Sequence, residues 1–447
     1  MALTRRSSFA WARVLGVTGA TGVLAACAGS TGGKETSPAV TLQPTTLEVW
    51  ANPDALQFKN QAEAFKKQNP SVSVNTVAGG NLTKLQAALA AGTPPDIGTA
   101  IIADQPTLGP KGLAEPVSQA LKGQKGWAPD GYLPGLKAAH TFKGELVAAP
   151  YIVNATPIAM NLDLLDRAGL KLPAANWTWD QLADYAVKLT LRSGDRTTQW
   201  GYATAFTGDF TASNDFNTIL HSFGGDWTDA AGQKAAFNSP EGQAALDWLV
   251  SIVRTKQASP LPWPDEWATT AAPMGRGRGF ANGASGGVAM IPSETGELKV
   301  LQQAATFRWQ PVVPPRKTKL AAHSSSGSWY IAKGAPHRAA AVEWVRFACL
   351  PDQLAQFAVT SGSLPPHEAA AARPEWQEYL KSNPIYQAHL DTAKGAVTYP
   401  PVPGWSDVRA VLATAIGDAL LGKATPRAAL DDAARQGDAI FAQARGG

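Results

Sequence analysis

The chain has 447 residues, of which 45% are hydrophobic and 17% are charged, with 39 basic and 35 acidic side chains. Without the three arginines of its first thirteen residues, 36 basic residues face 35 acidic ones, so charge gives no argument for nucleic-acid binding. The length suffices for two domains, and two cysteines are too few for a cysteine metal cluster.

Residues 1–27 have the pattern of an export signal. Arg5, Arg6 and Arg13 form a basic region, and small and apolar residues follow from Val14 to Ala26. This stretch is about as long as the apolar core of a signal peptide and too short to cross a bilayer as a helix. An ordinary cleaved signal peptide and an N-terminal anchor helix are the alternatives.

The apolar stretch ends in Leu24-Ala25-Ala26-Cys27, which resembles the lipobox of bacterial lipoproteins. The resemblance implies a diacylglycerol on Cys27 and a protein anchored at the extracytoplasmic face of a membrane. The arginine pair resembles a twin-arginine signal, although the expected hydrophobic residue comes one position late, at Phe9; the export route stays open. Residues 28–45 are rich in Gly, Ser, Thr and Pro, and we expect a flexible linker there.

The next segment alternates strands and helices. Strands are predicted at 46–50, 72–74 and 97–102, and helices at 55–67 and 82–91, with Gly92 just after the second helix. This order predicts a parallel sheet, in which ligands bind beyond the carboxyl ends of the strands. The residues expected on that rim are Trp50, Asn52, Asp54, Asn81, Asp104 and Gln105.

A second α/β unit follows. Thr178 and Gln181 have the spacing of a capping box at a helix start. Cys349 lies in an apolar helical pattern and is expected to be a buried thiol. The Gly-rich run 275–279 lacks the Lys-Ser/Thr of a phosphate-binding loop and is expected to be a mobile loop. The further predictions are a strand at 158–161 and helices at 162–169, 178–191, 240–256, 335–350, 406–421 and 425–444.

Several motifs occur in the order found in one protein family. They are Ala91-Gly92-Thr93-Pro94-Pro95-Asp96-Ile97, Gly112-Leu113-Ala114-Glu115-Pro116, Trp177-Thr178-Trp179-Asp180-Gln181-Leu182, Asn238-Ser239-Pro240-Glu241-Gly242, Gly287-Val288-Ala289-Met290 and Ser326-Gly327-Ser328-Trp329-Tyr330. Each motif is weak alone, but their joint order extends over nearly all of the mature chain. The chain therefore resembles the family 1 extracellular solute-binding proteins, a maltose-binding-protein-like family.

This resemblance implies an α/β fold of two lobes, the type II periplasmic-binding-protein fold, with a hinge and a ligand cleft between the lobes. Residues 46–152 plus 326–361 would form the first lobe, and residues 153–325 plus 362–447 the second. Closure around a ligand would be recognised by the transmembrane subunits of an ABC permease. The resemblance implies a monomer that needs no cofactor and no metal, and no enzyme activity.

Sugars present hydroxyl groups to carboxylates and amides and apolar faces to aromatic rings, and the chain has fifteen tryptophans. Trp405, before a C-terminal helix, is the expected stacking platform, whereas Trp50 and Trp329 fit the core equally well. Helix capping is the alternative for Asp104 and Asp215. The candidates from the rim and from the resemblance are Trp50, Asn52, Asn81, Asp104, Gln105, Tyr151, Asn154, Asp215, Phe216, Trp263, Trp267, Ser293, Glu294, Trp329 and Trp405.

The predicted function is a substrate-binding lipoprotein of an ABC importer for a neutral mono- or oligosaccharide. A first alternative ligand is glycerol 3-phosphate or a related polyol phosphate, which would need a cation in the cleft; Arg276, Arg278 and Arg409 have no assignable place there. A second alternative is an exported glycoside hydrolase, which would need a pair of carboxylates at a defined separation. No His-Glu-x-x-His motif is present. A structural or adhesive surface protein would not explain the two-lobe order.

Overall fold

The computed structural model describes residues 42–79, 81–204, 210–261, 279–280 and 287–446. Residues from Leu42 onward form one compact unit. The predicted signal segment, Cys27 and most of the linker therefore lie outside the described residues, as do Trp263, Trp267, Arg276 and Arg278. No helix of the described part is long and apolar enough to cross a membrane.

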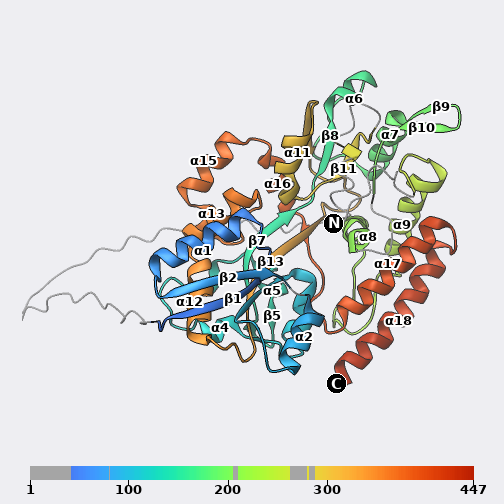
Figure 1. The fold of residues 1–447 in the computed structure, drawn as a ribbon. Helices are drawn as coiled ribbons and strands as arrows, with labels where there is room; N and C mark the ends of the chain where they lie inside the picture. Colours follow the sequence, from blue (N-terminus) through green and yellow to red (C-terminus); the bar gives the residue numbers. More distant parts are fainter. Residues whose placement is uncertain (1–41, 80, 205–209, 262–278, 281–286, 447) are drawn as a thin grey trace, which may run out of the picture. The chain divides into compact units, whose positions relative to one another are not determined.

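The first part of the chain contributes most of the strands of a seven-stranded sheet, which we call the main sheet (Figure 1). Its strand order is β14-β13-β3-β1-β2, and β4 and β7 also pair with β13. β1 is parallel to both β2 and β3, as predicted, whereas β13 is antiparallel to β3 and makes the sheet mixed. Its strands are β1 (Thr45–Ala51), β2 (Val72–Ala78), β3 (Ile97–Ile101), β4 (Ala114–Glu115), β7 (Ala149–Ala155), β13 (Ala322–Ala332) and β14 (Ala396–Val397).

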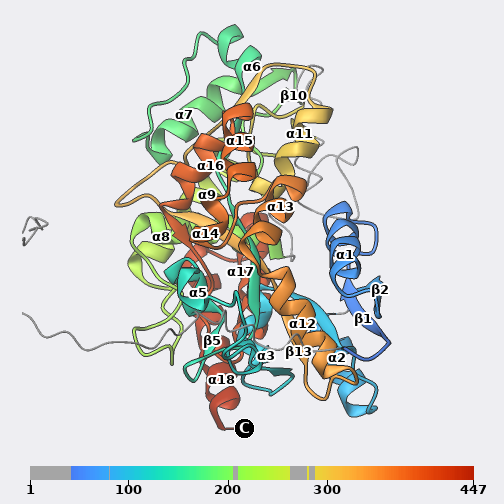
Figure 2. The same cartoon turned by 90° about the vertical axis from the view of Figure 1, so that its left-hand side faces the viewer.

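Aromatic side chains attach helices to this sheet. Phe65 of α1 lies 5.1 Å from Trp344 of α12 between ring centroids, and Phe58 of α1 lies 5.2 Å from Phe357 of α13. These helices lie side by side in both views (Figures 1 and 2). They are α1 (Leu56–Gln68), α12 (Arg338–Ala348) and α13 (Pro351–Ser361), and α2 (Leu82–Ala90) connects β2 to β3. Burial of these aromatic rings stabilises the packing of the helices on the sheet.

Local signals in the sequence explain several boundaries. Asn81 caps α2 by accepting from the Lys84 backbone N–H at 3.0 Å, and Gly92 follows that helix with φ 73°. The buried carboxylate of Asp96 accepts from the backbone N–H groups of Glu48 and His337, at 2.9 and 2.7 Å. Asp96 thus has a structural role at the turn into β3.

A second, three-stranded sheet has the order β11-β8-β12, with both neighbours antiparallel to β8. The capping box of Thr178 and Gln181 is present at the start of α7. The helix predicted at 240–256 ends as α9 at Val250 and continues as a π-helix over Ser251–Thr255. The strands of this sheet are β8 (Ile158–Asn161), β11 (Met290–Pro292) and β12 (Trp309–Val312). The long helices of the second half of the fold are α7 (Trp179–Leu189), α8 (Phe210–Phe223), α9 (Pro240–Val250), α17 (Trp405–Leu421) and α18 (Pro426–Gly446).

Short helices and strands lie between these longer elements in the sequence. The helix predicted at 162–169 ends two residues early as α6 (Leu162–Arg167). The short elements that precede α7 are η1 (Ile102–Asp104), α3 (Gln105–Leu108), α4 (Val117–Ala120), η2 (Pro129–Gly131), α5 (Pro134–Ala139), β5 (Thr141–Phe142) and β6 (Glu145–Leu146). Those that follow it are β9 (Leu191–Ser193), β10 (Arg196–Gln199), η6 (Thr295–Glu297), α11 (Leu298–Ala304), α14 (Glu368–Ala371), α15 (Pro374–Ser382) and α16 (Tyr386–Ala393).

The paired strands β7 and β13 connect the two sheets (Figure 1). Ile152 faces Gly327 and Val153 faces Ser326 in their register. The lobe boundaries expected from the sequence, 152/153 and 325/326, therefore fall at neighbouring positions of one strand pair. Gly327 is required there because a Cβ would lie 2.4 Å from the hydroxyl of Tyr151.

The core contains most of the described tryptophans, including Trp248, Trp344 and Trp376. Cys349 is buried as predicted, and burial raises the pKa of its thiol to about 12.

Candidate functional site

Polar side chains gather where β7 and β13 leave the main sheet. β13 is buried along nearly all of its length, yet it is polar from His323 to Ser326 and apolar from Trp329 onward. Buried polar groups need hydrogen-bond partners, so this half of the strand must contact other polar residues. It meets Asn154 of β7, Asn217 of α8 and Glu294 after β11, and together with His323 and Ser325 these residues form what we call the Glu294 cluster.

Two neighbours flank the Glu294 carboxylate, one beside each oxygen. The Ser325 hydroxyl donates to Oε2 at 3.0 Å, and the Asn154 amide donates to the Ser325 hydroxyl at 3.1 Å. Nε2 of His323 lies 3.8 Å from Oε1. The Glu294 side chain is 25% exposed while that of His323 is only 2% exposed. The carboxylate is thus held by these neighbours on its buried side, while another side of it is exposed to solvent.

Two buried acceptors beside this carboxylate have no protein partner among the described residues. They are Oδ1 of Asn154 and the hydroxyl oxygen of Ser293. Gly296 leaves space at Asn154, because a Cβ on Gly296 would lie 3.7 Å from Oδ1. An unsatisfied buried oxygen costs about 1–3 kcal/mol, which a donor from a ligand or a water molecule would recover.

A second group of polar residues, the Tyr399 cluster, lies next to the first. Arg409 of α17 donates from Nε to the Ser213 hydroxyl at 2.7 Å and from a terminal nitrogen to Oδ1 of Asn214 at 2.8 Å. Its guanidinium lies 4.4 Å from the ring centroid of Tyr399, whose hydroxyl donates to Asn214. Burial raises the pKa of Tyr399, and Arg409 opposes that shift. The His323 and Tyr399 rings, 5.3 Å apart, join the two clusters.

Two predicted carboxylates border the Tyr399 cluster. Asp215 accepts from the Thr204 hydroxyl at 3.0 Å and lies near enough to Tyr399 to influence its pKa. Asp104 accepts from the Ile101 backbone N–H at 3.0 Å; burial raises its pKa, while that hydrogen bond and the charge of Arg409 act in the opposite direction.

The start of α17 also contacts η1, the short helix that follows β3. The hydroxyl of Ser406 donates to the Ala103 carbonyl at 2.9 Å. The adjoining Gln105 donates to the Ser328 hydroxyl at 2.9 Å, and its Oε1 is buried without a partner in the described part of the chain.

The aromatic candidates are core residues in this conformation. The Trp405 ring is fully buried, 5.1 Å from Trp227 and stacked at 6.5 Å on Phe441. Trp329 packs between Phe58 and Trp344. The remaining rings are also buried: Tyr151 packs against Phe58, Phe216 lies against Trp227, and Trp50 donates its indole N–H to Glu48. Core packing, the structural alternative for Trp50 and Trp329, is therefore what the structure shows for them.

Two rim candidates have local roles. Asn52 accepts from the Asp54 backbone N–H at 3.0 Å, and Asn81 caps α2.

The structure thus brings together Asn154, Ser293 and Glu294, with Asp104 and Asp215 nearby. Sequence reasoning missed His323, Ser325 and Tyr399 and left Arg409 without a position. The run of four polar residues within an otherwise apolar strand pattern, His323 to Ser326, was the signal that could have found the first two.

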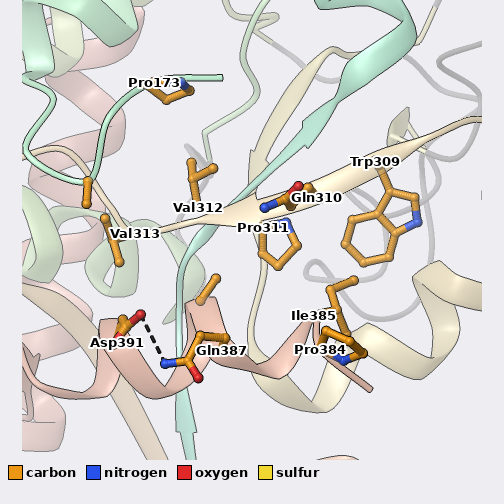
Figure 3. Close-up of a pocket in the computed structure, with 12 residues that line it drawn as sticks. Pro173, Trp309, Gln310, Pro311, Val312, Val313, Pro384, Ile385, Gln387 and Asp391 are labelled. Carbon is orange, nitrogen blue, oxygen red and sulfur yellow. Dashed lines mark hydrogen bonds between the residues drawn. The ribbon is translucent and has the colours of Figure 1, made fainter. Parts of the chain in front are cut away.

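A hollow of about 460 Å³ lies elsewhere, between β12 and α16 (Figure 3). Trp309, Pro311 and Pro384 line it, and Asp391 is its one charged lining residue. Asp391 already accepts from Gln387 at 3.2 Å and from Lys394 at 2.6 Å. None of the predicted site residues is among its lining residues, so we do not assign the ligand site to it. In the described part of the chain, no group of His, Cys, Asp and Glu is suited to a metal ion.

Comparison with known proteins identifies several similar proteins, each over most of its length. The sn-glycerol-3-phosphate-binding periplasmic protein UgpB of Salmonella paratyphi A is 24% identical, over 90% of this chain and 93% of its own length. An ABC substrate-binding protein from Listeria monocytogenes, solved with cycloalternan, has a TM-score of 0.78 at 23% identity and covers 90% of this chain and 99% of its own. An ABC transporter solute-binding protein from Thermotoga lettingae, solved with alpha-D-tagatose, has a TM-score of 0.76 at 23% identity, with coverage of 89% and 100%.

These structures confirm the α/β periplasmic-binding-protein fold. The model of one family matches residues 60–384, which is most of the chain. That family binds solutes outside the cytoplasm and is not enzymatic, so the hydrolase alternative is excluded. The chain belongs to the bacterial extracellular solute-binding proteins.

Proposed function

We propose that this protein is the substrate-binding component of an ABC importer and that it binds a neutral mono- or oligosaccharide at the Glu294 cluster. One observation carries the proposal: a partly exposed carboxylate is flanked at both oxygens and lies beside a buried, unpartnered Asn154 oxygen. A sugar hydroxyl can donate to one such acceptor while its neighbour donates to the other. A site of this kind discriminates strongly against ligands that lack the hydroxyls.

The relatives support this ligand class. The proteins from Listeria monocytogenes and Thermotoga lettingae were solved with a cyclic oligosaccharide and a monosaccharide. A third similar structure, from Thermotoga maritima, contains maltose, with a TM-score of 0.75.

A polyol phosphate is the second candidate, and one observation favours it. Arg409 is buried at the Tyr399 cluster, where the sequence alone could not place it, and UgpB is among the relatives. However, its guanidinium already donates to Ser213 and Asn214. Carboxylates also surround the cluster: Asp104 interacts with Arg409, and Asp215 and Glu294 influence Tyr399. This balance of charge favours a neutral ligand over a dianion.

We further propose that the ligand is held between two lobes, residues 46–152 plus 326–361 and residues 153–325 plus 362–447. The position of both boundaries in the β7–β13 pair supports a hinge there. A lipid on Cys27 and a linker over residues 28–45 would keep the receptor near its permease. The lipobox resemblance at Leu24-Ala25-Ala26-Cys27 supports that anchor.

A ligand panel tests the proposed class directly. Residues 42–447, which form one compact unit, would be mixed with maltose, mannotriose, tagatose, sn-glycerol 3-phosphate and glycerophosphocholine, and the melting temperature would be recorded. We expect at least one saccharide to raise it, because a ligand that binds only the folded state stabilises that state. Stabilisation by the phosphate compounds alone would support the second candidate and contradict the first.

A further inference from the structure

We propose that His323 is a positioning residue for Glu294, held as a neutral imidazole with its proton on Nε2 by a relay from Trp227 through Asn217. The functional part of this inference rests on the proposed ligand site at Glu294. Its structural part, the position of one proton, stands without any ligand and can be measured by itself.

The relay begins with the side-chain amide of Asn217, whose orientation is fixed twice. The indole N–H of Trp227 donates to Oδ1 of Asn217 at 2.8 Å, and an indole nitrogen can only donate. On the other side, Nδ2 of Asn217 donates to the Val397 carbonyl at 3.2 Å, and a carbonyl can only accept. Reversal of the amide would set donor against donor at Trp227 and acceptor against acceptor at Val397. Asn217 therefore presents its NH₂ group to its remaining neighbour.

That neighbour is the imidazole of His323. Nδ2 of Asn217 lies 3.0 Å from Nδ1 of His323. Since Asn217 is the donor, Nδ1 must accept and carries no hydrogen. The proton of a neutral imidazole is then on Nε2, the nitrogen 3.8 Å from Oε1 of Glu294. An imidazolium would set an N–H at Nδ1 against the NH₂ group of Asn217 in a buried place. The backbone at this position is anchored as well, because the His323 backbone N–H donates to the Thr218 hydroxyl at 2.8 Å.

This arrangement matters for the carboxylate. The Ser325 hydroxyl orients Glu294 by a hydrogen bond at Oε2, and a neutral N–H 3.8 Å from Oε1 attracts the carboxylate without neutralising its charge. The Glu294 side chain is 25% exposed, so ligand hydroxyl groups can reach it from the solvent side. An imidazolium in the same place would form an ion pair with Glu294 and compete with the ligand for it. The relay thus preserves an oriented, charged acceptor in a region that is otherwise buried.

The test is the tautomer of His323 in the absence of ligand. Residues 42–447 labelled with ¹⁵N-histidine would be examined by long-range ¹H–¹⁵N correlation at pH 7.5, and the signal of His323 among the six histidines identified by its loss in His323→Gln. We expect a protonated Nε2 and an unprotonated Nδ1. In Asn217→Asp, an acceptor replaces the donor that faces Nδ1, so we expect a proton on Nδ1 and a large shift of that nitrogen.

Asn161→Asp is the matched control. Asn161 is also buried, but it caps α6, where aspartate caps equally well, so the His323 signal should keep its wild-type pattern. A proton on Nδ1 in the wild-type protein, or no change in Asn217→Asp, would overturn the inference. If His323→Gln does not fold, the other five histidines can be replaced singly, and the wild-type signal that none of them removes belongs to His323. Failure of the saccharide panel would leave this result unaffected.

Discussion

The hydroxyl of Ser325 donates to Oε2 of Glu294 over 3.0 Å and so joins the crossing strand β13 to the segment that follows β11. Ser325 is the last residue before the boundary that we propose for the lobes, and its neighbour Ser326 faces Val153 across the strand pair. A ligand that binds Glu294 would therefore act on a side chain that is anchored at the proposed hinge. This relationship couples ligand capture to the strands along which the lobes would move.

Ser325→Ala should weaken saccharide binding. The substitution removes one of the two groups that orient Glu294, and a hydrogen bond to a charged group contributes about 1.5–3 kcal/mol, which is roughly a tenfold or larger change in Kd. Isothermal titration with the saccharide that stabilises the protein most would measure it. Ser326→Ala, whose hydroxyl contacts His140 at 3.3 Å instead, is the matched control. Equal effects of the two substitutions would argue against a specific role of Ser325.

Trp405→Ala should lower the free energy of unfolding by about 3–5 kcal/mol, because the ring is fully buried against Trp227, Tyr399 and Phe441. Urea unfolding would measure the loss. Trp405→Phe keeps an aromatic ring and should cost less. If Trp405 also forms a platform for the ligand, the Ala variant will bind the saccharide more weakly than the Phe variant under conditions in which both are folded. A fully stable Ala variant would be inconsistent with the observed packing.

Acid should destabilise the protein through two buried histidines. Burial lowers the pKa of His140 from 6.5 to about 4 and that of His389 from 6.5 to about 3. Above pH 6.5 both are neutral whether folded or unfolded, so they impose no penalty. As the pH falls from 6.5 towards 4, each of these histidines binds a proton in the unfolded chain but not in the folded one. This difference lowers the free energy of unfolding by roughly 3 kcal/mol for each histidine. Below their folded pKa values the loss levels off.

Melting temperatures between pH 7.5 and 4 would measure this loss. His140→Gln should flatten the decline, since glutamine takes up no proton in either state. His337→Gln is the comparison, because the side chain of His337 is 43% exposed. An equally steep decline in His140→Gln and the wild-type protein would contradict the assignment.

Cys27→Ser should release the protein from membranes. The substitution removes the thiol that would carry the lipid, while the remainder of the signal segment is unchanged. Fractionation of cells that express each form, followed by detection of the protein in membrane and soluble fractions, would measure the effect. Persistent membrane association of Cys27→Ser would favour an N-terminal anchor helix instead.

The sequence predicted the elements whose signals are local. The strand–helix alternation at the start of the main sheet and the capping box at Thr178 are both present, because spacing and capping chemistry determine them. The helix predicted at 240–256 was not divided in the prediction, because the apolar pattern does not distinguish the α-helical residues 240–250 from the π-helical residues 251–255.

The site was predicted only in part. Glu294 and Asn154 could be nominated because family motifs lie beside them. His323 and Ser325 could not, since their importance depends on partners far away in the chain, such as Asn217 and Trp227. Trp329 and Trp405 were nominated as ligand-binding residues, but their rings lie in the core. A tryptophan at a suitable position in the sequence can have either role, and only its packing in the folded protein distinguishes them.

The most direct test of the account is the comparison of wild-type protein with Glu294→Gln in calorimetric titrations of maltose, mannotriose, tagatose and sn-glycerol 3-phosphate. Glutamine keeps the size of the side chain but removes the charge and one acceptor, and Glu115→Gln, on a surface ion pair with Arg338, is the control. The account predicts that at least one saccharide binds the wild-type and control proteins and binds Glu294→Gln about tenfold or more weakly. Tight binding of sn-glycerol 3-phosphate with no saccharide bound, or a saccharide affinity that is unchanged in Glu294→Gln, would contradict it.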